Sequence, residues 1–168
     1  MKRILSLFAL VSLSACGLHP VYSGGSHGAV ARKLGHVEVA PIEGKAGWLV
    51  RNALNDRLSA MNGGGPTYKL VVKLDDQISG FGLRSDAAVT RERRTLRARY
   101  QLLDAATGAQ IIDDTAGSDA GIDVTSSEYA TIAAEDTALE RLSQTLADQI
   151  VARLTIFAAR DSSHGRAP

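Results

Sequence analysis

Hydrophobic and polar residues alternate along two long stretches of the chain, and this period of two predicts β-strands. The clearer stretch is Val89 to Leu103, and Thr67 to Ser79 alternates in the same way. Successive side chains of a strand point to opposite faces of a sheet, so each stretch is expected to bury one face and expose the other. The apolar face of the longer stretch consists of Leu96, Ala98, Tyr100 and Leu102.

Two shorter stretches supply the other predicted strands. His36 to Ile42 is short, β-branched and followed by a turn. Asp104 to Gly108 has the composition of a tight hairpin turn. We therefore expect Ala109 to about Thr115 to return beside the preceding strand, with a looser continuation toward residue 124. The loop that joins the two long strands is expected at Gly80 to Asp86.

Two stretches have the 3.6-residue hydrophobic period of an amphipathic helix. Trp48 to Met61 follows a predicted turn at Gly44 to Gly47 and ends at the Asn-Gly-Gly-Gly-Pro run behind it. Thr125 with Glu128 three residues later matches a capping box, and a helix is expected from there to about Ala159. The apolar stripe of this long helix consists of Leu139, Leu142, Leu146, Ile150, Leu154 and Phe157.

The predicted order β-α-β-β-β-α implies an α/β two-layer sandwich. A helix between the first two strands implies a parallel crossover, and hairpins join the last three strands. Each helix has one apolar stripe and each long strand one apolar face, so we expect a four-stranded mixed sheet with both helices packed on one face. The domain is expected to span residues 34–160, and residues 161–168 are expected to form a disordered tail.

The first residues have the pattern of a secretory signal. Lys2 and Arg3 precede an apolar run, Ile4 to Leu13, that is too short to span a bilayer as a mature helix. The Leu-Ser-Ala-Cys sequence ending at Cys16 resembles a bacterial lipobox. This resemblance implies a lipoprotein signal peptide over residues 1–15 and a covalent lipid anchor on Cys16. An ordinary signal peptide with an incidental cysteine is the alternative interpretation.

A lipid on Cys16 would tie the remainder of the chain to a membrane surface. Residues 16–33 are rich in Gly, Ser and His, as expected of a flexible, lipidated tether. Gly17 follows the cysteine, and by resemblance to lipoprotein sorting a residue other than Asp there favours the outer membrane. The predicted location is therefore the periplasmic side of the cell outer membrane. Cys16 is the only cysteine, so an intramolecular disulfide is excluded.

Charge is unevenly distributed, although the formal net charge is only +1. Six arginines lie between Arg84 and Arg99, whereas ten acidic residues and one basic residue lie between Asp104 and Asp148. Like charges on one face repel, so a row of arginines requires either acidic neighbours such as Asp113 or an anionic ligand such as phosphate. Both interpretations are compatible with the sequence. The arginines on the polar face of the long strand are Arg91, Arg93, Arg97 and Arg99.

No sequence pattern indicates catalysis, a metal site or a cofactor. The four histidines lack metal-ligand spacing, no Gly-x-Ser-x-Gly occurs, and Gly63 to Thr67 lacks the lysine of a P-loop. The pairs Asp75-Asp76 and Asp113-Asp114 lie on predicted strands, so the two carboxylates of each pair point to opposite faces. We therefore expect that the protein is not an enzyme. Nucleic acid is a poor candidate ligand, because the signal directs the chain to the envelope and aromatic residues make up only 5%.

The predicted loop between the long strands carries two apolar side chains, Phe81 and Leu83. A loop between long strands projects from the core, and exposed apolar residues on it indicate a contact with a partner. The alternative is that the loop folds back over the sheet edge and buries Phe81 locally.

Four segments of the chain, taken together, carry a family resemblance. They are the lipid junction from Leu13 to Tyr22, the strand and turn from Arg97 to Gly108, and two parts of the last helix, Ser127 to Asp136 and Gln149 to Leu154. These segments resemble the alphaproteobacterial lipopolysaccharide-assembly lipoproteins, the LptE family. The resemblance implies a two-layer α/β domain. It also implies a partner, the outer-membrane β-barrel LptD, whose lumen the lipoprotein plugs while the pair inserts lipopolysaccharide into the outer leaflet.

The resemblance also implies lipopolysaccharide binding by basic residues near the second hairpin. By position Arg84 is the best match, whereas Ala133 and Ala134 stand about where well-studied members have a second basic residue. A periplasmic lipoprotein accessory of another envelope lipid-transport system is the alternative function. The residues expected to bind lipopolysaccharide are Arg84, Arg91, Arg93, Arg97 and Arg99, and those expected to contact the partner are Phe81 and Leu83.

Overall fold

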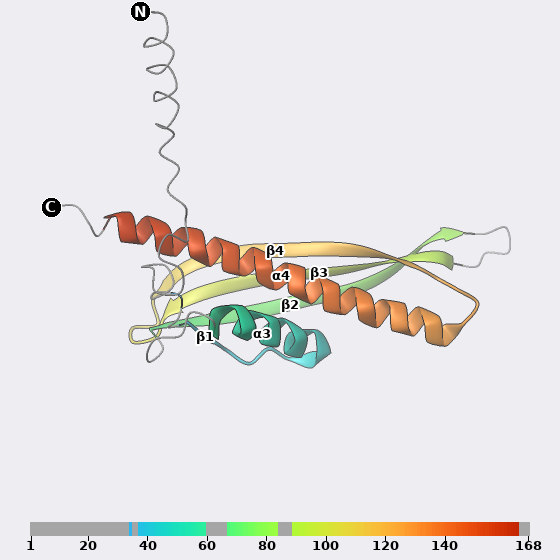
Figure 1. Cartoon of the computed structure of the whole chain (residues 1–168), viewed down its shortest axis with the longest axis horizontal. Helices are drawn as coiled ribbons and strands as arrows, with labels where there is room; N and C mark the ends of the chain where they lie inside the picture. Colours follow the sequence, from blue (N-terminus) through green and yellow to red (C-terminus); the bar gives the residue numbers. More distant parts are fainter. Residues whose placement is uncertain (1–33, 35–36, 60–66, 84–88, 165–168) are drawn as a thin grey trace, which may run out of the picture.

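The computed structural model describes residues 34, 37–59, 67–83 and 89–164, without the side chains of residues 83, 89 and 161–164. One sheet with two helices against it makes up this part of the chain (Figure 1). The predicted order β-α-β-β-β-α and the predicted two-layer α/β class are confirmed. The elements are β1 (Val37–Val39), α3 (Gly44–Ser59), β2 (Tyr68–Leu83), β3 (Val89–Asp104), β4 (Gln110–Asp123) and α4 (Glu128–His164).

The sheet is mixed and has the strand order β1-β2-β3-β4. β1 runs parallel to β2, whereas β2, β3 and β4 pair as antiparallel neighbours. Both helices lie on one side of the sheet (Figure 1). The C-terminal end of β2 and the N-terminal end of β3, which pair with each other, extend beyond α3. We call the other side the helix-free face; it carries the odd-numbered side chains of β3 from Arg91 to Gln101.

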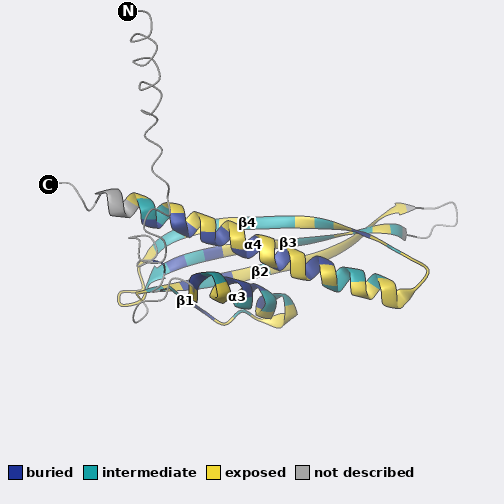
Figure 2. Ribbon diagram, viewed as in Figure 1, coloured by how far each residue is buried: buried dark blue, intermediate teal, exposed yellow. Residues whose placement is uncertain are grey.

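The core lies between the two helices and the even-numbered side chains of the sheet. Leu96, Ala98, Tyr100 and Leu102 of β3 are all buried, as predicted. Buried residues concentrate where α3 and α4 overlap the sheet, and the last part of β2, residues 77–82, is exposed (Figure 2). Apolar burial of this kind is the main favourable term in folding, so this zone holds the layers together. Five of the six predicted α4 stripe residues are buried, namely Leu139, Leu142, Leu146, Ile150 and Leu154, and Phe157 packs against them half-buried.

The predicted turn before the first helix is wrong, because α3 begins at Gly44 and includes Gly47. A Cβ atom at Gly47 would lie 2.6 Å from the backbone oxygen of Ile42. The glycine is therefore required by close packing of the helix against the preceding segment and not by a turn conformation. The predicted turn at Asp104 is present, and the Asp104 carboxylate accepts hydrogen bonds from the backbone N–H groups of Ala106 and Thr107.

β2 is longer than predicted, and the looser continuation expected for the last strand is confirmed. β2 continues to Leu83, so Gly80 to Leu83 is strand and not loop. β4 runs to Asp123, through small residues that give little hydrophobic alternation. In both cases pairing with the long β3 satisfies the backbone hydrogen bonds that the side-chain pattern alone does not specify.

The ends of α4 also differ from the prediction. The helix begins at Glu128, and its N-cap is Ser127, whose hydroxyl accepts a hydrogen bond from the N–H of Ala130 at 3.4 Å. The Thr125 hydroxyl instead donates to the Ser127 carbonyl at 3.1 Å, so the predicted capping box is wrong. At the other end the helix continues to His164, and residues 161–164 are helical instead of tail. No glycine or proline interrupts the helical sequence before residue 165.

Candidate functional site

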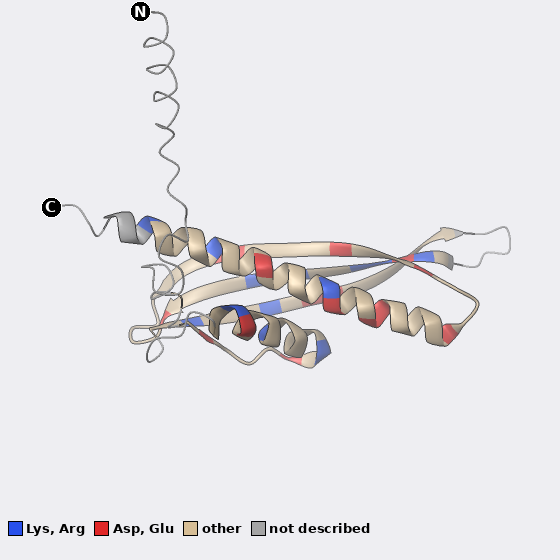
Figure 3. Ribbon diagram, in the orientation of Figure 1, with Lys and Arg blue, Asp and Glu red and all other residues tan. Residues whose placement is uncertain are grey.

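The predicted arginine row lies on the helix-free face, with its side chains on alternate residues of β3. Arg91, Arg93 and Arg99 have side chains that are more than half exposed. Basic positions on β3 lie beside acidic positions on β4 (Figure 3). The arginine side chains are therefore exposed to solvent on the helix-free face, and the neighbouring strand β4 carries residues of opposite charge.

Three arginines of the row form ion pairs with aspartates of β4. Arg91 Nε lies 3.2 Å from Asp123, and Arg93 Nε lies 4.0 Å from Asp119. Antiparallel register brings these oppositely charged residues to neighbouring positions. The acidic neighbours that the sequence allowed as one interpretation are therefore present.

The third of these pairs has the best geometry. Arg99 donates from Nε and Nη2 to the two carboxylate oxygens of Asp113, at 2.9 and 2.7 Å. Gln101 donates a further hydrogen bond to this carboxylate at 2.9 Å. These donors, Arg99 first, hold the pKa of Asp113 at about 2, and the same contact raises the pKa of Arg99.

Arg97 is the exception in the row. Its register neighbours are Asp75 on β2 and Gly117 on β4, so β4 offers no carboxylate directly beside it. Within the described part of the chain, Arg97 has no ion pair within 4.0 Å and no hydrogen bond. It lines an open hollow of about 590 Å³ on this sheet, together with Lys73, Arg99 and Thr115.

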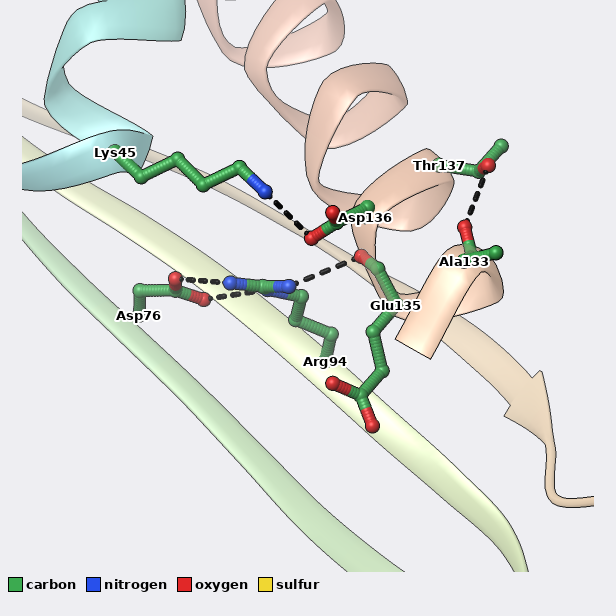
Figure 4. A network of polar contacts seen from close by, with 7 residues as sticks. All are labelled: Lys45, Asp76, Arg94, Ala133, Glu135, Asp136 and Thr137. Atoms are coloured by element: carbon green, nitrogen blue, oxygen red, sulfur yellow. Dashed lines mark hydrogen bonds and ion pairs between the residues drawn. The ribbon is translucent and has the colours of Figure 1, made fainter. Parts of the chain in front are cut away.

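A second polar cluster, which the sequence analysis did not identify, lies on the helix-covered face (Figure 4). Arg94 donates to both carboxylate oxygens of Asp76, at 2.9 and 2.6 Å, and to the backbone oxygen of Glu135 on α4 at 3.0 Å. Lys45 at the start of α3 forms an ion pair with Asp136 at 2.7 Å. The cluster therefore links β2, β3 and both helices. The sequence did carry a signal for it: Arg94 lies two residues before the buried Leu96 on the same strand, so both side chains point to the helix-covered face.

Glu92 belongs to the same region. Its Oε2 atom is buried without a hydrogen-bond partner among the described residues. Burial raises the pKa of Glu92, and the nearby carboxyl group of Glu135 raises it further. Ala133 and Ala134, where a second basic residue was expected from the family, lie on the preceding turn of α4. This end of α4 is consequently acidic.

The predicted partner contacts lie on strand, and no loop carries them. Phe81 pairs with Arg91 across β2 and β3, is 41% exposed, and has the Arg93 guanidinium carbon 5.4 Å from its ring centroid. Phe81 is thus neither on a projecting loop nor buried by one. Leu83 pairs through its backbone with Val89. Arg84 and Cys16 lie outside the described residues. Other large apolar side chains that are exposed are Trp48, Ile78, Tyr129, Ile132 and Ile156.

The adjacent aspartates behave as predicted from strand geometry. Asp113 pairs with Arg99 on the helix-free face, whereas Asp114 pairs with Arg153 of α4 on the opposite face. In the described ranges, no three His, Cys, Asp or Glu side chains gather closely enough to hold a metal ion. None of the helices described has the combined length and apolarity needed to cross a bilayer.

Comparison with known proteins identifies the family. The LptE family model, whose description is lipopolysaccharide-assembly, matches residues 34–154. A crystal structure from Caulobacter crescentus CB15, of a protein classed as a lipoprotein, is 28% identical with a TM-score of 0.66 and covers 84% of this chain and 99% of its own. Sequence comparison with curated proteins gives no match.

Two more distant structures share the fold. Rare lipoprotein B from Shewanella oneidensis is 14% identical with a TM-score of 0.54, covering 75% of this chain and 96% of its own. Lipoprotein B from Nitrosomonas europaea is 16% identical with a TM-score of 0.57, covering 76% of this chain and 88% of its own. Since the family model matches well over half of the sequence, the chain belongs to the lipopolysaccharide-assembly family LptE.

Proposed function

We propose that this protein is an outer-membrane lipoprotein that works with an LptD-like β-barrel to assemble lipopolysaccharide into the outer leaflet. In this proposal it plugs the barrel and binds lipopolysaccharide. Membership of a family of lipopolysaccharide-assembly proteins, which are not enzymes, supports the general role. The observation that carries the proposal is the arginine row on the sheet face opposite α3 and α4.

The geometry of this face suits phosphate groups better than a neutral ligand. Arginine presents planar, paired donors that match phosphate oxygens. The ion pairs to Asp123, Asp119 and Asp113 keep the row compact in the absence of ligand. Because these pairs are exposed, each is weak and can exchange a carboxylate for a phosphate at small cost.

Copurification from membranes tests the barrel partner. We expect the tagged full-length protein to recover a heat-modifiable outer-membrane barrel. Its absence under conditions that preserve other envelope complexes would favour an accessory role in a different lipid-transport system.

Lipopolysaccharide binding is tested separately by changing Arg91, Arg93, Arg97 and Arg99 to Gln. Weaker binding with a flatter salt dependence is expected, since charge-assisted contacts are lost.

The lipid anchor has its own test. Cys16→Ser is expected to accumulate as an unprocessed or soluble precursor that incorporates no labelled palmitate, because the serine hydroxyl cannot form the thioether. Ser14→Ala, two residues earlier in the signal, serves as a control that keeps the cysteine. Normal palmitate labelling of Cys16→Ser would contradict the anchor assignment.

A further inference from the structure

The hollow beside Arg97 differs in charge from the remainder of the arginine row. Its lining residues come from three neighbouring strands and from Gln149 of α4, and the odd-numbered strand residues place their side chains on the helix-free face. Three of these side chains are cationic and one is a carboxylate. The residues that matter here are Lys73 and Asp75 of β2, Arg97 and Arg99 of β3, and Thr115 and Gly117 of β4.

Two of the three cations are free to bind a ligand. Among the described residues, neither Lys73 nor Arg97 forms an ion pair or hydrogen bond. The only carboxylate of the lining, Asp75, accepts hydrogen bonds from Gln77 at 3.1 and 3.3 Å instead. Elsewhere in the row each arginine has an aspartate on β4. Asp75 lies directly opposite Arg97 in the register but forms no ion pair with it, so the three cations of the lining outnumber its one carboxylate and the hollow keeps a net positive charge.

The pairing of β2 with β3 places two of these positive charges next to each other. Lys73 lies directly opposite Arg99 across β2 and β3. Directly opposite residues have Cβ atoms only about 4.5–5.5 Å apart, and like charges in that arrangement destabilise the pair. Arg99 is partly neutralised by Asp113, but Lys73 has no such partner. An anion bound beside Lys73 would offset its repulsion from Arg99.

Gly117 gives the hollow its shape. A Cβ atom at this position would lie 3.1 Å from Arg97 Nη1 and 3.2 Å from its Cγ, so the arginine side chain lies along bare β4 backbone. The backbone of Gly117 is held from the strand edge by Gln149 of α4, with N–H to Oε1 at 3.2 Å and Nε2 to the carbonyl at 3.4 Å. By contrast, a Cβ atom at Gly121 would meet nothing within 4 Å.

We propose that Lys73, Arg97 and the Thr115 hydroxyl form a discrete site for a phosphoryl group, kept open by Gly117. The lining supplies a point charge, a planar pair of donors and a hydroxyl, which together suit the oxygens of a phosphate dianion. The proposal rests on the proposed function in taking the phosphates of lipopolysaccharide as one source of this group. Inorganic pyrophosphate is the other source with the same chemistry.

Binding measurements on the full-length protein in detergent test the site. Wild type is expected to bind both inorganic pyrophosphate and lipopolysaccharide, and dephosphorylated lipopolysaccharide more weakly. Arg97→Gln and Lys73→Gln should each weaken pyrophosphate binding by roughly five- to tenfold, as loss of a charge-assisted contact at a half-open site implies. Arg153→Gln, which removes an equal charge from an α4 arginine outside the row that is paired with Asp114 at 2.9 Å, should change it less than about twofold.

A second pair of variants alters shape without altering charge. Gly117→Val fills the space under Arg97 and should weaken pyrophosphate binding several-fold, whereas Gly121→Val should have little effect. Both variants are checked for an unchanged unfolding transition, so that a folding defect is recognised.

The outcomes separate this site from the proposed function. Failure of wild type to bind pyrophosphate, or equal losses in Arg97→Gln and Arg153→Gln, would overturn the discrete site. If lipopolysaccharide binds but Arg97→Gln leaves that binding unchanged, the assignment of its phosphates to this site is wrong while the proposed function stands. If pyrophosphate binds as expected and lipopolysaccharide does not, the site stands and the proposed function fails.

Discussion

The ion pair between Arg94 and Asp76 is expected to stabilise the fold more than any pair on the helix-free face. Its side chains are only 11% and 24% exposed, and its guanidinium also donates to the Glu135 backbone. Asp76→Ala would leave the arginine beside α4 with a single acceptor among the partners seen here. Charged groups that lose a partner in a partly buried site are costly, because water cannot fully replace the lost carboxylate.

The magnitude follows from exposure and hydrogen-bond number. Removing one partner of a fully buried pair costs about 3–5 kcal/mol, and a single hydrogen bond to a charged group contributes about 1.5–3 kcal/mol. Because this pair retains some solvent contact, we expect Asp76→Ala to lower the free energy of unfolding by about 2–3 kcal/mol. Replacing both residues together, by Arg94→Met and Asp76→Leu, should recover most of that loss, since no unpaired charge remains.

The pair between Arg99 and Asp113 provides a matched control. Its hydrogen bonds have nearly the same lengths, 2.9 and 2.7 Å, but the Arg99 side chain is 65% exposed. A double-mutant cycle for each pair, measured by urea unfolding at low and high salt, isolates the two coupling free energies. We expect a large, salt-resistant coupling for Arg94 with Asp76 and a small, salt-sensitive one for Arg99 with Asp113. Equal couplings would refute the argument that burial decides the difference.

Three further predictions concern pH and the exposed end of the hairpin. Arg99→Gln should return the pKa of Asp113 from about 2 toward its ordinary value in a carboxyl NMR titration, and an unchanged pKa would contradict the assigned cause. The raised pKa of Glu92 means that the folded state holds its proton more tightly, so this contribution to stability is present at low pH and is lost as pH rises through the folded-state pKa. In wild type the unfolding free energy should therefore decrease as pH rises above about 4.5, and Glu92→Gln should make this decrease smaller. The same slope of unfolding free energy against pH in both proteins would rule out Glu92 as its source. Phe81→Asp should leave the unfolding free energy within about 1 kcal/mol while reducing recovery of the barrel partner; Ile156→Asp, a substitution at an equally exposed position on α4, is the control.

The sequence alone determined the order of elements, the buried face of each long element and the family. Strong period-two and period-3.6 patterns predict the elements and their apolar faces because local chain geometry fixes which side chains share a face, whereas the family was indicated by the resemblance of four segments. Leu96 to Leu102 and the stripe of α4 were predicted correctly for that reason. Element ends were predicted less well, since the N-cap at Ser127 and the extension of β2 depend on hydrogen bonds to particular neighbours.

Only the tertiary structure decided which arginines have partners. Periodicity placed Arg91, Arg93, Arg97 and Arg99 on one face but could not give the pairing with β4 that brings an aspartate within 4.0 Å of three of them and sets Gly117 beside Arg97. It also could not show that the even-numbered Arg94 lies against Asp76 and α4, because that contact joins three elements far apart in sequence. A face is a property of one strand, whereas an ion pair or a hollow requires the relative positions of several.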